Sequence, residues 1–314
     1  MSIRYGARSR PGTMVSTWLN GLVSGTAVSG AAYFAGGTTG SYVTTVDRFL
    51  FADDSRTTLG TGLSSARTGL AGLASAVAGY YAGGYATGWI DTVDRFLFSN
   101  DSRTTLGTGL SSARNGTAGA ASSVAGYFAG GNIATGYAKQ TTVDRFLFSN
   151  DSRTTLGTGL ATATQNFAGA ASSVAGYFAG GAVAAGQTTV VDRFLFSNDS
   201  RTTLGTGLSN GTTGLGGAAS AVAGYFGGGG SPYLATVDRF LFADDSRTTL
   251  GTGLSSARRY GAGAASSVAG YFGGGTTGSV VDTVDRFLFA DDSRTTLGTG
   301  LSSARSTLGA MASQ

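Results

Sequence analysis

One stretch of sequence recurs along the whole chain and sets its architecture. The first copy, residues 45–63, reads TVDRFLFADDSRTTLGTGL, and five further copies follow it with few changes. The aspartate that opens the Asp-Arg-Phe-Leu-Phe core recurs every 46 to 50 residues, at Asp47, Asp94, Asp144, Asp192, Asp238 and Asp285. A fixed period in this range indicates a solenoid, a propeller or an array of stacked units.

Each repeat contains four candidate strands separated by turn residues. In the third copy we expect these strands at residues 118–122, 124–129, 142–148 and 153–160, which are usual strand lengths. Alternation in the third strand places Val143 and Leu147 on one face, and Phe146 and Phe148 on the other. Apolar groups on both faces are typical of a sheet that packs between neighbouring sheets.

The two ends of the chain complete a ring of such units. Residues 16–22 align with a fourth strand that has no blade of its own, and residues 307–314 align with an extra first strand. The first strand of the first blade can therefore come from either end, and we expect the last residues to supply it, which removes open sheet edges. The sequence thus predicts an all-β propeller of six four-stranded blades, closed by the chain termini. A seventh, partial blade or an edge shared between subunits is the alternative.

The strand pattern resembles the kelch repeat, a four-stranded propeller unit. A Tyr-Phe-Ala-Gly-Gly segment at residues 33–37 matches the strand of kelch units that ends in Gly-Gly, and Phe49 matches the aromatic residue of the next strand. Trp18 falls at the tryptophan position of the fourth kelch strand, where the six full copies carry leucine. The resemblance covers residues 14–314, implies a kelch-like propeller and leaves the function open.

The amino-acid sequence of the repeats is similar to that of kelch-like repeats in virion proteins of tailed bacteriophages, including phages of cyanobacteria. The relevant segments are Arg-Thr-Thr-Leu-Gly-Thr-Gly-Leu-Ser-Ser-Ala-Arg and Gly-Tyr-Phe-Ala-Gly-Gly. This resemblance implies a structural or adhesive virion protein, assembled in the host cytoplasm and exposed outside the cell, such as a tail, fibre or decoration component. A free carbohydrate-binding lectin and a self-assembling extracellular fibre subunit are the alternatives.

Composition argues against enzymatic chemistry. The chain has no cysteine, no histidine and no glutamate, which excludes histidine-based triads, cysteine nucleophiles and the copper site of galactose oxidase, a kelch-type enzyme. The aspartates recur identically in every unit, without the unlike environments that carboxylate catalysis needs. We therefore expect no catalytic residues, no cofactor and no metal. Without histidine, assembly and binding should be insensitive to pH between about 5 and 8.

The turn between the third and fourth strands contains the only acidic clusters. In the first copy it reads Asp53-Asp54-Ser55-Arg56. One such turn offers too few oxygen ligands for calcium, and asparagine and aspartate at this place favour turns that bond to their own backbone. We expect these residues to form such turns, with arginine–aspartate pairs between blades.

The copies differ mainly in two sets of connecting loops. One set follows the second strand, at residues 38–42, 85–90, 132–140, 182–187, 230–234 and 276–281. The other precedes the first strand, at residues 68–69, 115–116, 165–167, 210–213 and 259–260. Both sets emerge at the same end of an up-and-down blade, so we expect one nearly constant end and one variable end.

The variable end supplies the candidate binding face, because its loops carry aromatic and cationic residues of the kind that binding surfaces use. Drift in unconstrained loops is the alternative explanation. The candidate residues are Tyr42, Tyr85, Trp89, Tyr137, Lys139, Phe167, Tyr233, Arg259 and Tyr260.

Residues 1–13 precede the repeats and match none of them. Much of the formal net charge of +4 lies there, so the body lacks the basic stripe of a nucleic-acid-binding protein. No apolar run has the length of a signal peptide or a membrane span.

We expect this arm to contact another chain, either a second virion protein or another copy, through Arg4, Tyr5, Arg8 and Arg10. The expected partners of the protein are thus virion proteins, copies of itself and a cell-surface glycan, with no nucleic acid and no membrane insertion. Should the arm not be the anchor, the turn aspartates at the constant end are the next candidates: Asp54, Asp101, Asp151, Asp199, Asp245 and Asp292.

Overall fold

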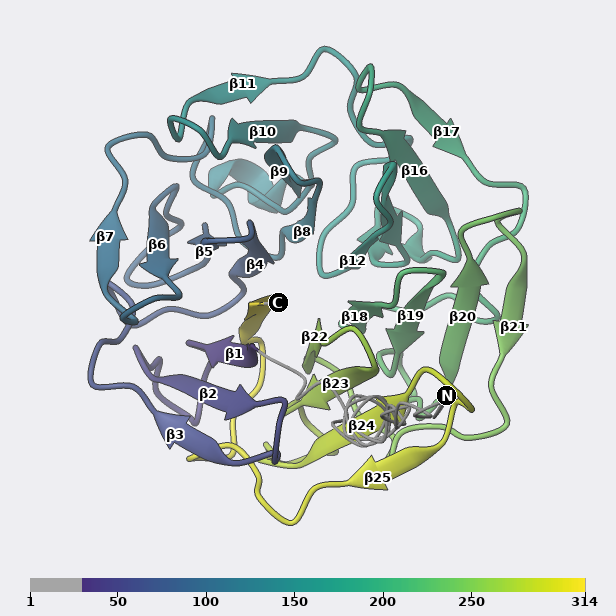
Figure 1. Cartoon of the computed structure of the whole chain (residues 1–314). Helices are drawn as coiled ribbons and strands as arrows, with labels where there is room; N and C mark the ends of the chain where they lie inside the picture. Colours follow the sequence, from purple (N-terminus) through teal and green to yellow (C-terminus); the bar gives the residue numbers. More distant parts are fainter. Residues whose placement is uncertain (1–29, 314) are drawn as a thin grey trace, which may run out of the picture.

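The computed structural model describes residues 30–313, which form six four-stranded antiparallel sheets arranged around a central axis (Figure 1). The innermost strands are β26 (Gly309–Ser313), β4 (Ala71–Ala74), β8 (Ala118–Ala121), β12 (Ala168–Ala171), β18 (Gly216–Ala219) and β22 (Ala262–Ala265). The second strands are β1 (Ala31–Ala35), β5 (Ala78–Ala82), β9 (Ala125–Ala129), β13 (Ala175–Ala179), β19 (Ala223–Gly227) and β23 (Ala269–Gly273). The predicted propeller of six blades is confirmed for this part of the chain.

The two outer strands of each blade have the most constant sequence of the repeat. The third strands are β2 (Val46–Leu50), β6 (Val93–Leu97), β10 (Val143–Leu147), β16 (Val191–Leu195), β20 (Val237–Leu241) and β24 (Val284–Leu288). The outermost strands are β3 (Arg56–Thr58), β7 (Arg103–Thr105), β11 (Arg153–Thr155), β17 (Arg201–Thr203), β21 (Arg247–Thr249) and β25 (Arg294–Thr296). Two loops add a short helix, η1 (Thr135–Tyr137), and a hairpin of β14 (Ala182–Val183) and β15 (Gly186–Gln187).

The outermost strands are shorter than the sequence predicts, because β11 ends at Thr155 rather than at residue 160. Glycine weakens strand pairing, and Gly157 and Gly159 follow that point. A Cβ atom at Gly159 would lie 2.5 Å from the carbonyl oxygen of Thr141. The glycines therefore let the chain leave the ladder, and Gly159 passes close to the residues that precede the third strand of the same blade.

The last described strand closes the ring, as predicted. β26 pairs antiparallel with β1, so the first blade joins residues from both ends of the described chain. The Ala31 amide donates a 2.9 Å hydrogen bond to Ser313 Oγ. Met311 is 3% exposed and belongs to the core between the first and second blades.

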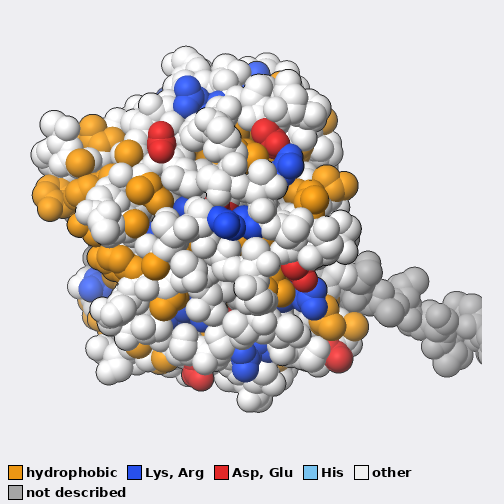
Figure 2. Space-filling view, turned by 90° about the vertical axis from the view of Figure 1, so that its left-hand side faces the viewer, with side chains coloured by type: hydrophobic (Ala, Val, Ile, Leu, Met, Phe, Trp, Pro, Cys, Tyr) orange, Lys and Arg blue, Asp and Glu red, His pale blue; other side chains and the backbone are white. Residues whose placement is uncertain are grey.

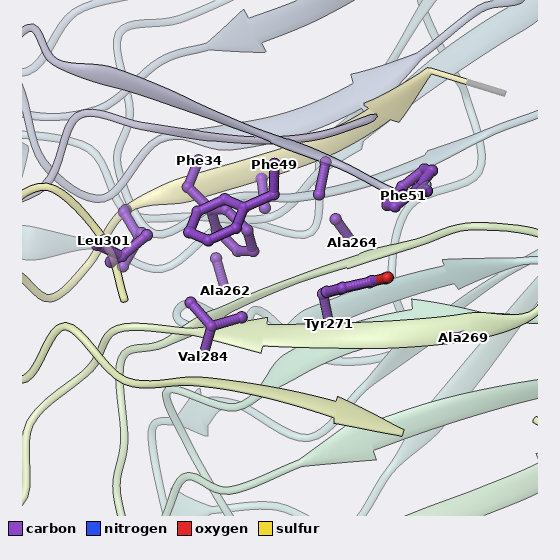
Figure 3. Packing of buried hydrophobic residues seen from close by; sticks show 12 residues of the cluster. Phe34, Phe49, Phe51, Ala262, Ala264, Ala269, Tyr271, Val284 and Leu301 are labelled. Carbon is purple, nitrogen blue, oxygen red and sulfur yellow. The ribbon is translucent and has the colours of Figure 1, made fainter. Parts of the chain in front are cut away.

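The hydrophobic core lies between blades rather than in one central mass. Figure 3 shows the layer between the last blade and the first, where Phe34 and Phe49 approach Ala262 and Val284. The rings of Phe34 and Phe49 meet edge to face with centroids 5.7 Å apart. Each blade therefore buries both faces against its neighbours.

A second closed ring connects the blades through the backbone, at the connections that precede the innermost strands. The amide of Gly116 donates to the carbonyl of Gly69 at 2.7 Å, and the pattern continues around the axis until Gly69 donates to Thr307. All its members have positive φ angles of 53° to 72°. They are Gly69, Gly116, Asn166, Gly214, Tyr260 and Thr307. This ring ties all the blades together at the end of the axis where the variable loops lie.

Polar contacts between blades form two further layers. In the outer layer, which we call the belt, Tyr33 and Arg48 of the first blade both bond to the carboxylate of Asp101, which lies in a turn of the second blade. The same set of bonds recurs at every junction, with tyrosine–aspartate distances of 2.8 to 3.1 Å. The expected arginine–aspartate pairs between blades are confirmed.

The belt also gives the turn aspartates a structural role that differs from the docking role considered for them. Asp54, Asp101 and their copies are about 20% exposed, and each is bonded to a tyrosine and an arginine of the preceding blade. Their carboxylates therefore act within the ring, and they are poor candidates for a free docking surface.

The inner layer is built on the aspartate of each third strand. Asp144, fully buried, accepts bonds from Thr155 of its own blade and from Ser111 and Arg114 of the preceding blade. Burial raises the pKa of the equivalent Asp47, but bonds from Thr58, Ser302 and Arg305 outweigh it and hold that pKa below its ordinary value. The buried arginine is replaced by Thr164 and Thr212 on either side of the fourth blade.

No helix in residues 30–313 has both the length and the apolar character needed to cross a membrane.

Candidate binding site at the variable end

The two sets of divergent loops meet at one end of the propeller, as predicted. Thr68, which precedes an innermost strand, forms a backbone bridge with Tyr85, which follows a second strand. Asn115 and Asn132 are joined in the same way. The hairpin turns that carry the belt lie at the opposite, constant end of the strands.

A pair of glycines positions each loop of the variable end. In the second blade Gly83 and Gly84 end the second strand with φ angles of +67° and +112°, which side chains rarely adopt. A Cβ atom at Gly84 would lie 2.8 Å from the carbonyl oxygen of Thr68. This close approach allows the two backbone hydrogen bonds between Thr68 and Tyr85, at 2.8 and 3.0 Å.

Four of the predicted aromatic residues form one continuous cluster, which we call the aromatic row. The centroid distances are 5.8 Å from Tyr42 to Tyr85, 4.9 Å from Tyr85 to Trp89, and 5.2 Å from Trp89 to Tyr137. All three pairs meet edge to face, a favourable geometry for aromatic side chains. The row thus joins loops of the first three blades.

The row remains accessible from outside. Tyr42 is 41% exposed and Tyr137 is 70% exposed, which makes Tyr137 the most exposed large apolar residue in the described chain. In the edge-on view of Figure 2, hydrophobic side chains gather on a projection at the left-hand edge, which is the variable end.

The aromatic row borders a basin of about 690 Å³ at the mouth of the central axis. Its other walls come from the connections of the backbone ring, including Asn166, Tyr260 and Thr307. None of its fourteen lining residues is charged. Side-chain amides of Asn115, Asn132 and Gln165 also line it, although these residues were not among the predicted ones. The sequence could have indicated them, because all three lie in the divergent loops and carry side-chain amides.

Two polar atoms of the lining residues are buried without a hydrogen-bond partner in the described chain. They are Nε1 of Trp89 and Oδ1 of Asn132. Asn132 is only 5% exposed. Both atoms are shielded from solvent, and buried polar groups without partners are costly in folded proteins.

A second cluster borders the basin, because it includes the lining residue Tyr260. The guanidinium of Arg259 stacks on Tyr233 at 5.0 Å and on its neighbour Tyr260 at 4.8 Å. Within residues 30–313, Arg259 and Lys139 are the cations with no carboxylate at ion-pair distance. Both belong to the variable end, while every other described arginine pairs with an aspartate.

Phe167 does not belong to the binding face. It is 6% exposed and packs edge to face with Phe178 in the core between the third and fourth blades. Its position corresponds to Leu70 and Leu215, which are also buried. The expectation that it is an exposed loop aromatic was wrong, because the divergent connection ends one residue before it.

The arm residues Arg4, Tyr5, Arg8 and Arg10 lie outside the described residues. Within residues 30–313, no three acidic side chains come together as a metal site would require. The candidate site is therefore a neutral, aromatic and amide-lined basin.

Comparisons with known proteins add no identity. No family model matches the chain, and no curated protein is similar to it. The resemblances to kelch repeats and to phage virion repeats receive no support from these comparisons. The structure supports the coarser statement that residues 30–313 form a propeller of six four-stranded blades.

Proposed function

We propose that this protein is a non-enzymatic recognition propeller that binds its ligand in the basin at the variable end. The observation that carries this proposal is the basin itself, where exposed aromatic rings lie beside buried polar atoms that have no partner in the described chain. Concave sites with aromatic walls and a few polar groups are typical of ligand-binding pockets.

The rest of the blade structure supports this role, because it holds the basin in place. Every junction carries a tyrosine–aspartate bond and an arginine–aspartate pair, and the backbone ring links all blades beneath the basin. A site on a rigid scaffold loses little conformational entropy when it binds.

We further propose that the propeller works as an adhesive or structural component of a phage particle. This part of the proposal depends on the resemblance between the amino-acid sequence of the repeats and that of virion repeats. Its partners would be other virion proteins, reached through the basic arm, or copies of itself. A free lectin remains the second candidate, because the basin by itself suits a sugar ligand.

Sedimentation and cell binding test these roles together. A virion component should sediment as a small species alone and join larger particles only with its partners, whereas a fibre subunit should polymerise. Labelled protein should bind bacterial cell envelopes, and Trp89→Ala should reduce that binding at least tenfold. The control, Val124→Ser, changes a residue that is 65% exposed on a hairpin turn at the constant end and should bind as the wild type does. Equal binding by all three proteins would contradict a role for the variable end.

A further inference from the structure

We infer that the ligand of the basin is a neutral oligosaccharide, an inference that rests on the proposed recognition function. Charge is the first argument. A charged ligand that leaves water needs an opposite charge to compensate the lost hydration, and none of the residues lining the basin is charged. The lining instead offers hydroxyl and amide groups, which suit hydroxyl-bearing ligands.

The unpartnered polar atoms sharpen the chemistry. Trp89 Nε1 can only donate a hydrogen bond, and Asn132 Oδ1 can only accept one. A carboxylate could satisfy only the donor, and an ammonium group only the acceptor. A hydroxyl group both donates and accepts, so a ligand rich in hydroxyls matches a lining that contains both donors and acceptors.

The aromatic row supplies the apolar half of the contact. Sugars present C–H faces as well as hydroxyls, and aromatic rings combine a flat apolar body with a polar tip in Tyr and Trp. Trp89 is in contact with both Tyr85 and Tyr137, at 4.9 and 5.2 Å between centroids. Neighbouring rings of this kind can hold consecutive units of one chain, which favours an oligosaccharide over a single sugar.

The size of the basin argues against a folded protein as the ligand. Its volume of about 690 Å³ falls within the ~300–1,000 Å³ of typical small-ligand sites. Stable protein interfaces bury about 800 Å² on each partner and are enriched in arginine as well as aromatics. Arg259, an arginine of the variable end without a carboxylate partner in the described chain, does not line the basin.

Tryptophan fluorescence offers a direct test, because the chain has two tryptophans, Trp18 and Trp89. In a Trp18→Phe background, Trp89 is the single reporter. The probes are neutral hexasaccharides of glucose, mannose, xylose and N-acetylglucosamine, and a hexasaccharide of galacturonic acid as the acidic counterpart. We expect a saturable change in Trp89 emission with at least one neutral probe and none with the acidic one.

Two variants tie this signal to the basin. Tyr137→Ala should weaken binding about tenfold, because it removes an exposed ring that offers the ligand a flat apolar surface. Asn132→Asp adds a negative charge with little change in shape and should weaken binding by a similar factor. Val124→Ser, at the constant end, should leave the affinity unchanged.

Cell envelopes decide the matter independently of the probes chosen. Periodate, which cleaves the vicinal diols of sugars, should abolish Trp89-dependent envelope binding, and protease should leave it intact. The reverse pattern would overturn the glycan inference and identify a protein ligand, while the proposed recognition function would stand. Binding of the acidic hexasaccharide alone would overturn it too. So would unchanged Trp89 emission with every neutral and acidic probe. Envelope binding that does not depend on Trp89 would defeat the proposed function itself.

Discussion

The blade junctions and the basin both contain tyrosine, but the tyrosines have opposite surroundings. At the junctions, tyrosines, arginines and aspartates are bonded to one another from blade to blade, and the pattern recurs around the ring with little change. At the basin, Tyr137 projects into solvent, and Asn132 and Trp89 retain polar atoms without partners in the described chain. The carboxylates of the junctions are therefore engaged between blades, whereas the basin presents exposed aromatic rings to a ligand.

This difference explains why one end of each blade repeats and the other varies. A junction residue has partners in two blades, so a change on one side leaves a buried group unsatisfied on the other. A basin residue has few partners to lose. Variation can then change what is bound without changing the fold. The following predictions test this separation, from the largest expected effect to the smallest.

Alkaline pH should act on the junctions as a set. Burial, together with the neighbouring aspartate, raises the pKa of Tyr33, Tyr127, Tyr177 and Tyr225 to about 12, compared with about 10 in an unfolded chain. Because the folded pKa is the higher one, this contribution to stability is complete below pH ~10 and is lost as pH rises to ~12.

Chemical denaturation at a series of pH values measures this loss. The free energy of unfolding should stay level from about pH 5 to 9 and then fall steeply. Tyr127→Phe removes one phenol and should make the alkaline decline shallower. A level profile up to pH 12 would show that the belt does not hold the blades.

Breaking one buried ion pair should have the largest effect of any single substitution. In Asp144→Ala, Arg114 stays fully buried without its carboxylate, so stability should fall by about 3–5 kcal/mol. Asp192→Ala is the matched control, because Thr164 stands there in place of the buried arginine. Its cost should be clearly smaller, and equal losses in urea unfolding would contradict the role given to the buried arginine.

Gly84 tests the link between the scaffold and the basin. Gly84→Ala places a methyl group 2.8 Å from the Thr68 carbonyl at a φ of +112°, which should cost about 1–3 kcal/mol. It should also shift the emission of Trp89, because the same loop carries that residue. Gly88 lies in that loop, and a methyl group on it would meet nothing within 4 Å, so Gly88→Ala should change stability by less than about 0.5 kcal/mol.

The smallest effect on stability should come from the basin itself. Tyr137→Ala removes a side chain that is 70% exposed, so the free energy of unfolding should change by less than about 0.5 kcal/mol. Ligand binding should nevertheless fall. A large loss of stability in thermal unfolding would mean that the aromatic row holds the blades together and is not a separate binding surface.

Much of the architecture was predictable from the sequence, because it follows from local repetition. The period, the alternation within strands and the spare first strand at residues 307–314 predict six blades and their closure. The outer strand was predicted too long, because propensity alone does not show that Gly159 passes within contact of Thr141.

The site was predictable only in part, because its geometry depends on contacts between loops of different blades. The sequence located Tyr42, Trp89 and Tyr137 at one end, but not that Trp89 bridges loops of two blades. Phe167 was misplaced because a one-residue shift separates a loop position from a buried one. The backbone ring was foreseeable at Gly69 and Asn166, residue types that tolerate positive φ, but not at Tyr260.

The pairing of β26 with β1 also determines when the ring can be completed during synthesis. The second to sixth blades are each built from a continuous segment, so each can form soon after it leaves the ribosome. The first blade begins with β1 at residue 31 but lacks its inner strand until residue 313 has emerged. Until then, no described strand covers that edge of β1, and open edges are the kind that capture strands from other chains. The first blade is thus the first to begin and the last to be completed. When several copies are synthesised close together, the open edge of β1 can pair with another copy of the chain.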